Sequence, residues 1–589
     1  MNSKSKVKKS AAPTLSAPAV IRKIQARARS AGVRASAQNL LVELCRQDTT
    51  ARPDVAAMRA AESRCFEILE RELEALPFAG ARLERRPVNP AIQNHPHFSL
   101  PGYTRTPERP DGLSPEAAYA GRANLVFIAP GAHEKSGGAS LALNAHLDVV
   151  APYFPPRVKG GIVFGRGACD DKGPAVALVA ALKILAEVMP AAGLRWNKNV
   201  VAMFVLDEEI GGNGSLSLAT DRELKKLYDS VMVVETCGLN IYPANRGAVW
   251  YRAEVKPPAG VSAFEMSAFV IEELEREGAA IRAESRHRLF PARPVQTNHG
   301  MLGPFGEMPS RICGRVVFKI QFDRPPDKST GALIRDCLES GLANYAGLYG
   351  DKTKVTDPAT GKPMVARHYD LRRAGNGFEI TVHGATGHMG AVRERDGAIT
   401  KTAHLVRSLV FSKAQLEKVG GAMQLQLGGN CCGPNLILEG GQGFLPTHPM
   451  AEIMERVRRA AERGAENYLR RCGRTETGAA AVEVAYNKLH NAAFDGDPDS
   501  PAMRHAIAAA RRCGFWKDRP VVGYPVSCDA RLFATEYPGM PVLTSGPGEL
   551  AFAHSDAEQI ALQDIAAAAE FLALFMLRQT GTLTTQALK

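Results

Sequence analysis

The sequence predicts an α/β protein with more than one domain, and three observations support this. The chain has 589 residues, which is too long for one ordinary core. Apolar runs of strand length alternate with segments of helical periodicity, as in a sheet covered by helices. Several of these apolar runs end in a histidine or a carboxylate, which places a candidate site at one edge of the sheet.

Four apolar runs predict strands of this sheet, at 124–129, 140–150, 199–206 and 230–234. The run at 199–206 is almost continuously apolar, which is typical of a strand buried on both faces. A long apolar helix is predicted from Pro174 to about Met189, and residues 35–80 also have helical patterning.

The run at 140–150 ends in His146-Leu147-Asp148. Residues two apart on a strand point to the same side, so His146 and Asp148 leave the strand end together. A histidine that binds a metal needs its tautomer fixed by an acceptor, commonly a carboxylate. The triplet alone also fits an ordinary strand-end histidine paired with an aspartate.

Carboxylates follow the other apolar runs. A Gly-rich turn, 165–173, carries Asp170 and Asp171, and its spacing matches neither common phosphate-binding motif. Three adjacent acids, Asp207 to Glu209, follow the run at 199–206, and Glu235 follows the run at 230–234. Solvated loops or divalent cations would relieve their repulsion. Because four such turns converge on one sheet edge, we predict a metal centre.

The ligand types indicate which metal binds. Histidine nitrogen combined with carboxylate oxygen favours zinc, with cobalt or manganese as alternatives, whereas magnesium and calcium prefer oxygen-only sites. Several carboxylates favour two metals that share a bridging acid, about 3.5–4 Å apart.

These motifs, in this order, resemble the co-catalytic zinc hydrolase family of aminoacylases, acetylornithine deacetylase, succinyl-diaminopimelate desuccinylase and glutamate carboxypeptidase. The matching segments are HLD at 146–148, GRGACDDKG at 165–173, DEEIGG at 207–212 and ET at 235–236. The resemblance implies five metal ligands: His146, Asp170 as the bridging carboxylate, Glu209, Glu235 and, in the segment 548–556, His554. It also implies that Asp148 orients His146 and that Glu208 is the general base.

The resemblance also implies a hydrolase-like catalytic domain interrupted by an α+β lid that mediates dimers. The segment 378–390 is similar to the lid motif whose histidine stabilises the oxyanion in the partner's active site, and His388, not His383, matches it. The expected domains are a basic flexible arm (1–34), the catalytic domain (35–243 and 489–589) and the lid (244–488).

Two features depart from the family pattern. An insertion is expected at 256–375, because the lid histidine comes late. The lid strand that usually supplies an arginine for the substrate carboxylate offers glycines and Gln442 in 437–446 instead. Arg393 or Arg531 are alternatives, and the substrate-binding residues stay open.

Charge and cysteine content limit the partners. The formal net charge is +12, but nine Lys or Arg and no acid lie in residues 1–42, so most of the excess belongs to the arm. This argues against a nucleic-acid-binding face, and no apolar run is expected to reach the length that a bilayer needs. The arm also fits a transit peptide.

Eleven scattered cysteines, without a CxxC pair, favour a reducing, cytoplasmic location.

The predicted function is hydrolysis of a peptide or N-acyl amide bond in a small substrate, by water activated by two metals. Alternatives are a deacylase or other C–N hydrolase acting on a small non-peptide substrate, and a non-catalytic binding protein on the same fold. No GxSxG or cysteine–histidine signature favours covalent catalysis.

Overall fold

A six-stranded sheet forms the centre of the first domain. The computed structural model describes residues 16–133, 137–357, 360–393, 395–429, 434–486 and 490–583. The strand order is β1-β2-β6-β3-β7-β17, and β6, β3, β7 and β17 run parallel. The strands are β1 (Arg82–Pro87), β2 (Ala123–Ala129), β3 (Leu141–His146), β6 (Val200–Val205), β7 (Ser230–Val233) and β17 (Val542–Thr544). The predicted α/β sheet is therefore confirmed, and the segments after its parallel strands meet at one edge.

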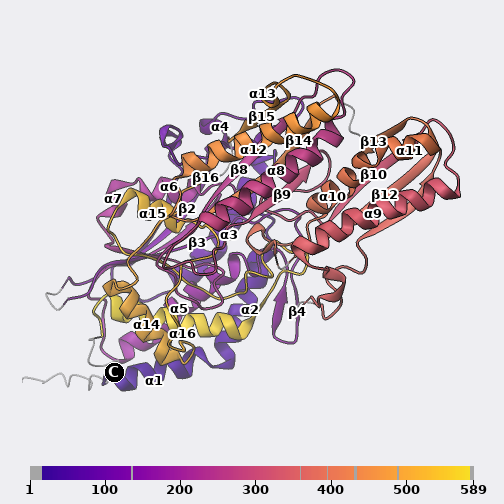
Figure 1. Ribbon diagram of the computed structural model, residues 1–589. Helices are drawn as coiled ribbons and strands as arrows, with labels where there is room; N and C mark the ends of the chain where they lie inside the picture. The colour runs from indigo at the N-terminus through magenta and orange to yellow at the C-terminus, as the bar shows by residue number, and fades with distance from the viewer. Residues whose placement is uncertain are drawn as a thin grey trace, which may run out of the picture.

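Helices pack against this sheet at the bottom of Figure 1. Helix α5 (Lys172–Ala191) contacts α16 (Leu562–Gln579), α2 (Ala31–Cys45) and α1 (Ala17–Ala28). Among the described residues, α5 is the one helix long and apolar enough to cross a membrane, with a mean hydropathy of 1.7, yet 78% of its apolar window is buried in the protein. The expectation that no run reaches this length is wrong for α5, and its packing explains its composition.

The N-terminal segment differs from the predicted flexible arm. Residues 17–28 form α1, which begins with a proline in its first turn and is followed by α2, whose N-terminus is capped by Ser30. Val20, Ile21, Ile24 and Ala28 are fully buried against α5 and α16. The basic residues lie between these apolar positions, so the charge does not prevent the segment from packing. Residues 1–15 lie outside the described part of the chain.

The second domain contains two units with the same β-α-β-β-α-β order, typical of ferredoxin-like folds. The first unit consists of β8 (Gly247–Val255), α8 (Ala263–Glu284), β9 (Thr297–Leu302), β14 (Leu436–Phe444), α12 (Met450–Arg471) and β15 (Val482–Ala485). Its sheet order is β15-β8-β14-β9, and the short β16 (His490–Asn491) also pairs with β8. Helices α8 and α12 cover this sheet at the top of Figure 1.

The second unit is inserted between β9 and β14 of the first. It consists of β10 (Arg315–Phe322), α9 (Lys328–Tyr349), β11 (Tyr369–Ala374), β12 (Gly377–His383), α10 (Ala398–Phe411), α11 (Lys413–Gly420) and β13 (Met423–Leu427), with sheet order β11-β12-β10-β13. It forms the right-hand part of Figure 1. The insertion predicted at 256–375 is therefore misplaced, because α8 and β9 belong to the first unit and β12 to the second.

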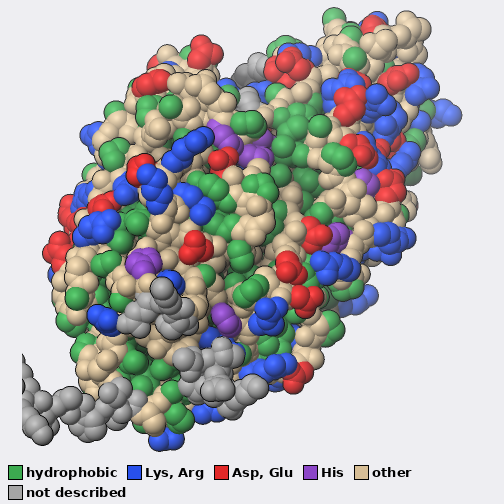
Figure 2. All heavy atoms as spheres, turned by 90° about the vertical axis from the view of Figure 1, so that its left-hand side faces the viewer, with side chains coloured by type: hydrophobic (Ala, Val, Ile, Leu, Met, Phe, Trp, Pro, Cys, Tyr) green, Lys and Arg blue, Asp and Glu red, His purple; other side chains and the backbone are tan. Residues whose placement is uncertain are grey.

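Of the hydrophobic clusters in the described residues, the two largest lie one in each domain. One core draws on both ends of the chain, from Val20 to Ile241 and from Ala502 to Leu583, and the other runs through both lid units, from Ala244 to Val482. Charged side chains of both signs occur across the face shown in Figure 2.

Candidate metal centre and active site

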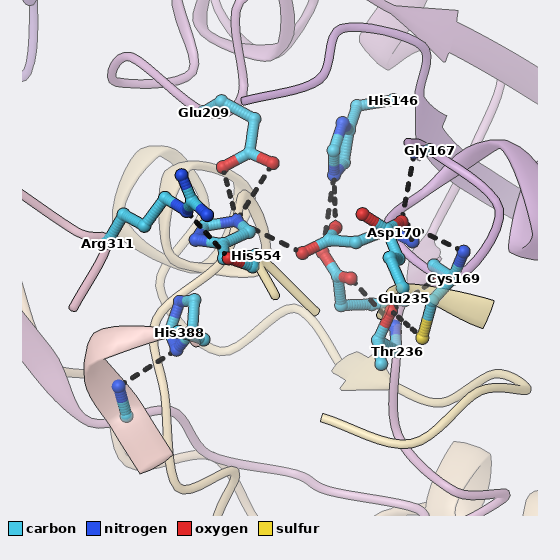
Figure 3. Close-up of polar contacts among 12 residues, drawn as sticks. His146, Gly167, Cys169, Asp170, Glu209, Glu235, Thr236, Arg311, His388 and His554 are labelled. Atoms are coloured by element: carbon cyan, nitrogen blue, oxygen red, sulfur yellow. Dashed lines mark hydrogen bonds and ion pairs between the residues drawn. The ribbon is translucent and has the colours of Figure 1, made fainter. Parts of the chain in front are cut away.

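The five predicted metal ligands lie together at the carboxyl edge of the sheet. His146 ends β3, Glu209 follows β6, Glu235 follows β7, His554 follows β17, and Asp170 lies in the turn before α5. Figure 3 shows their side chains converging. Together with Asp171, they form two buried groups, and the ligand atoms within each group lie within 4.8 Å of one another. The first group is His146, Asp170, Asp171 and Glu235, and the second is Asp170, Glu209 and His554.

Asp170 connects the two groups. Its Oδ1 lies 3.1 Å from His146 Nε2, and its Oδ2 lies 3.3 Å from His554 Nε2. On the far side of His554, the Glu209 carboxylate lies 2.9 Å from the same Nε2. Each oxygen of Asp170 thus faces a different group, which is the position that a bridging ligand would take, the role that the resemblance implies for this residue.

Asp148 organises the site in a way the sequence did not predict. The Nδ1 of His146 lies 3.0 Å from the backbone oxygen of Asp148 and 3.4 Å from its carboxylate, so the backbone oxygen is the closer acceptor. This contact places the proton on Nδ1 and leaves the Nε2 lone pair facing Asp170. The Asp148 carboxylate instead accepts hydrogen bonds from the backbone N–H groups of Glu208 and Glu209, at 3.0 and 2.9 Å.

The buried acids fit divalent cations. Burial, and then the charge of Asp170, raises the pKa of Glu235 to about 8. Asp171, which we did not predict as a ligand, accepts a hydrogen bond from the backbone N–H of His146 at 3.1 Å, and its other oxygen is buried with no partner in the described part of the chain. In the described residues, the ion-pair partners of Asp170, Glu209 and Glu235 are histidines and not lysine or arginine, and burying several carboxylates in this way is costly. Two cations would supply the missing positive charge, so the residues present fit a dinuclear centre.

Glu558 holds the turn that carries Asp170, and sequence reasoning missed it. Its Oε1 accepts the backbone N–H groups of Gly167, Cys169 and Asp170 at 2.9–3.1 Å, and its other oxygen pairs with Arg166. Both side chains of the pair are completely buried. Strand β18 (Gln559–Ala561), paired with β5 (Ile162–Phe164), brings Glu558 to this turn. The only sequence signal for Glu558 was its position directly before a strand and four residues after His554.

Glu208 belongs to neither ligand group and faces a cavity instead. The cavity, of about 40 Å³, is also lined by residues from both domains: Glu209, Arg246, Ala248, Trp250, Ser310, His388, Met389, Asn491, Ser527 and His554. Burial, and then the negative charge of Asp529, raises the pKa of Glu208 well above its usual range. A carboxyl group with a raised pKa beside a metal centre is suited to accept and return a proton.

His388 lines the same cavity, and it comes from the lid of the same chain. Its ring centroid lies 4.6 Å from that of His554, and its backbone N–H donates to the Ala553 oxygen at 3.1 Å. Nδ1 accepts a hydrogen bond from the Gly390 N–H at 2.9 Å (Figure 3). Burial, and then the neighbouring His554, lowers the pKa of His388 well below its usual range. The neutral ring therefore carries its proton on Nε2, ready to donate.

The resemblance led us to expect that His388 enters the active site of a partner subunit. In this structure the inserted unit instead places His388 in the active-site cavity of its own chain. His383 pairs with Asp370 at 2.8 Å and takes no part in the cavity, as predicted. Arg393, one suggested carboxylate ligand, lines a separate groove in the lid.

The fold and site define the class of the protein: an α/β dinuclear metallohydrolase with a lid. A family model described as Peptidase family M20/M25/M40 matches residues 142–578. The chain belongs to this family.

Among relatives, a protein of Pyrobaculum aerophilum assigned as a LysW-lysine/LysW-ornithine hydrolase is 30% identical over 198 residues, which is 33% of this chain and 53% of the relative. Carboxypeptidase G2 of a Pseudomonas species is 36% identical over 104 residues, 17% of this chain and 24% of the relative. The chain thus spans about half, or less, of the curated relatives it matches.

Solved structures share the fold. Human carnosine dipeptidase 1 has a TM-score of 0.53 at 12% identity and covers 95% of this chain and 100% of its own. The di-peptidase Dug1p of Saccharomyces cerevisiae has a TM-score of 0.54 at 12% identity, with 96% and 99% covered.

Proposed function

We propose that the protein hydrolyses an amide bond, peptide or N-acyl, in a small substrate. The observation that carries this proposal is one cavity lined by the carboxyl group of Glu208, by His388 and by two members of the ligand cluster, Glu209 and His554. The names of relatives in the same family, a LysW-lysine hydrolase and a carboxypeptidase, support amide hydrolysis.

The chain's own residues suggest how the reaction proceeds. His146, Asp170, Glu209, Glu235 and His554 would hold two divalent cations, which, when bound, acidify water and polarise the scissile carbonyl. Glu208 takes a proton from the attacking water and later returns it to the leaving amine. The Nε2–H of His388 donates to the oxygen that becomes negative during attack. Asp148 fixes the backbone of Glu208, so the base keeps its position.

Zinc is the proposed metal, because imidazole and carboxylate ligands are mixed in both groups. The choice between a peptidase and a deacylase depends on the substrate. A homodimer through the lid stays a prediction, and the site does not require one, since His388 comes from the same chain. The nine free cysteines of the described residues support the proposed cytoplasmic location.

Metal analysis and a substrate screen test this function. We expect close to two metal ions per chain, and hydrolysis of at least one compound in a panel of dipeptides and N-acyl amino acids. A chelator should abolish that activity, and added zinc should restore it. Less than one metal per chain, together with no chelator-sensitive hydrolysis, would refute the proposal and favour a binding protein on the same fold.

A further inference from the structure

The lid holds one loop of the first domain, residues 551–556, which carries the metal ligand His554. The loop lies between β17 and β18. Three lid residues donate hydrogen bonds to members of this loop other than His554: Thr386 to Asp556, His388 to Ala553 and Arg395 to Ala551. Part of the support for a ligand-bearing loop of the first domain therefore comes from the other domain.

A fourth lid residue, Arg311, contacts His554 itself. Arg311 is 1% exposed, and its Nε donates a hydrogen bond to the backbone oxygen of His554 at 3.0 Å (Figure 3). Its Nη2 pairs with the carboxylate of Asp556, and its Nη1 lies 3.0 Å from the carboxylate of Glu307. These two carboxylates compensate the buried charge and fix the plane of the guanidinium group, so that Nε points at the His554 oxygen.

The backbone of His554 needs such support. Its φ of +57° lies in the left-handed region, which residues with a side chain adopt only at an energetic cost. The Nδ1 of His554 is buried with no hydrogen-bond partner in the described residues. A metal-binding histidine normally has this nitrogen fixed by an acceptor, as His146 has in the backbone oxygen of Asp148. The position of the His554 ring therefore depends on how its backbone is held.

The lid segment that carries Arg311 is joined to the segment that carries His388. The two residues form an isolated antiparallel bridge, and backbone hydrogen bonds of 2.8 and 2.9 Å connect the two segments. The His388 ring lies 4.6 Å, between centroids, from the ring of His554. Arg311 on the backbone of His554 and His388 beside its ring are thus parts of one unit of the lid.

We propose that Arg311 is a positioning residue for metal binding. By holding the backbone oxygen of His554, it keeps Nε2 of this ligand 2.9 Å from Glu209 and 3.3 Å from Asp170. The second ligand group is then complete only while the lid contacts the loop. The first group, whose histidine is His146, takes no ligand from this loop. This inference rests on the proposed function, because it concerns the same dinuclear centre.

The test measures metal binding by the full-length protein. Calorimetric titration of the metal-free wild-type protein with zinc should show two ions per chain. Arg311→Met should keep one tightly bound ion and weaken the other by about 10- to 100-fold, the usual cost of removing a group that supports a metal ligand. Arg407→Met is the matched control, because Arg407 is a lid arginine that pairs with Glu272 of α8 at 2.7 Å, and this variant should bind both ions as the wild type does.

A second comparison separates positioning of His554 from general damage to the fold. Added to His554→Ala, Arg311→Met should cause no further loss of zinc affinity, because the ligand through which it acts is already absent. Arg311→Lys keeps a positive charge opposite Asp556 and should recover part of the affinity; it also serves if Arg311→Met does not fold.

Two results would overturn the inference while leaving the dinuclear centre intact. One is unchanged affinity for the second zinc ion in the Arg311 variants, and the other is a further loss when Arg311→Met is added to His554→Ala. Less than one zinc ion per wild-type chain, together with no chelator-sensitive hydrolysis, would instead refute the proposed function.

Discussion

Replacing Glu208 by glutamine should separate proton transfer from metal binding. The side chain of Glu208 belongs to neither ligand group, whereas its backbone N–H donates to Asp148 at 3.0 Å, a bond that the substitution keeps. Glutamine has nearly the same volume and cannot accept the proton from water. Burial, and then the charge of Asp529, disfavours the ionised form of Glu208, so a neutral glutamine should not destabilise the folded state.

The expected effect is a fall in kcat of about 1,000-fold, or about 4 kcal/mol in the activation barrier, which is the usual contribution of a general base. Metal content, measured by mass spectrometry of the purified protein, should stay at the parental level. Glu209→Gln is the contrasting variant, because Glu209 lies 2.9 Å from His554 within a ligand group, and it should lose metal as well as activity.

Two results would refute this reasoning. Hydrolysis by Glu208→Gln at the parental rate would show that another group accepts the proton. Loss of metal from Glu208→Gln, with full occupancy in Glu209→Gln, would show that the roles of the two neighbouring carboxylates are reversed.

Three further predictions follow from the packing and from the lid. Ile24→Ala should lower the free energy of unfolding by about 2–4 kcal/mol in urea titrations, because the Ile24 side chain is completely buried. Arg22→Ala, at an exposed position of the same helix, should have little effect, and equal losses in the two variants would contradict the packing of α1. Glu558→Gln should destabilise by about 3–5 kcal/mol, since it leaves a buried arginine without its carboxylate; unchanged unfolding would argue against this pair. A mixture of inactive His388→Gln and Glu208→Gln chains should stay inactive, because His388 serves its own chain; recovered activity would show that it acts in a partner.

Much of the metal centre could be predicted from the sequence, because its signals are local. The strands at 199–206 and 230–234 are short apolar runs, and the acids follow them directly, so the parallel sheet brings His146, Glu209 and Glu235 to one edge. The same local pattern led us to predict that the carboxylate of Asp148 orients the His146 ring. In the structure the backbone oxygen of Asp148 is the closer acceptor for this ring.

Long-range pairing could not be predicted. The two lid units repeat one order of strands and helices, and periodicity does not tell which strand pairs with which, so the insertion was misplaced. Whether His388 acts in its own chain depends on a contact with Ala553, far away in the sequence. For α1, by contrast, the apolar residues Val20, Ile21, Ile24 and Ala28 form a helical stripe that was readable but was obscured by the basic composition.

The packing of α5 has a consequence for synthesis of the chain. This helix is nearly all apolar, and it is covered by α16, which lies close to the last described residues. A ribosome completes α5 and the whole lid before it makes α16, so the part of the α5 surface that α16 covers stays exposed while several hundred residues are made. Such surfaces promote aggregation of folding intermediates. Productive folding of this protein in cells should therefore depend on chaperones that hold α5 until α16 has been made.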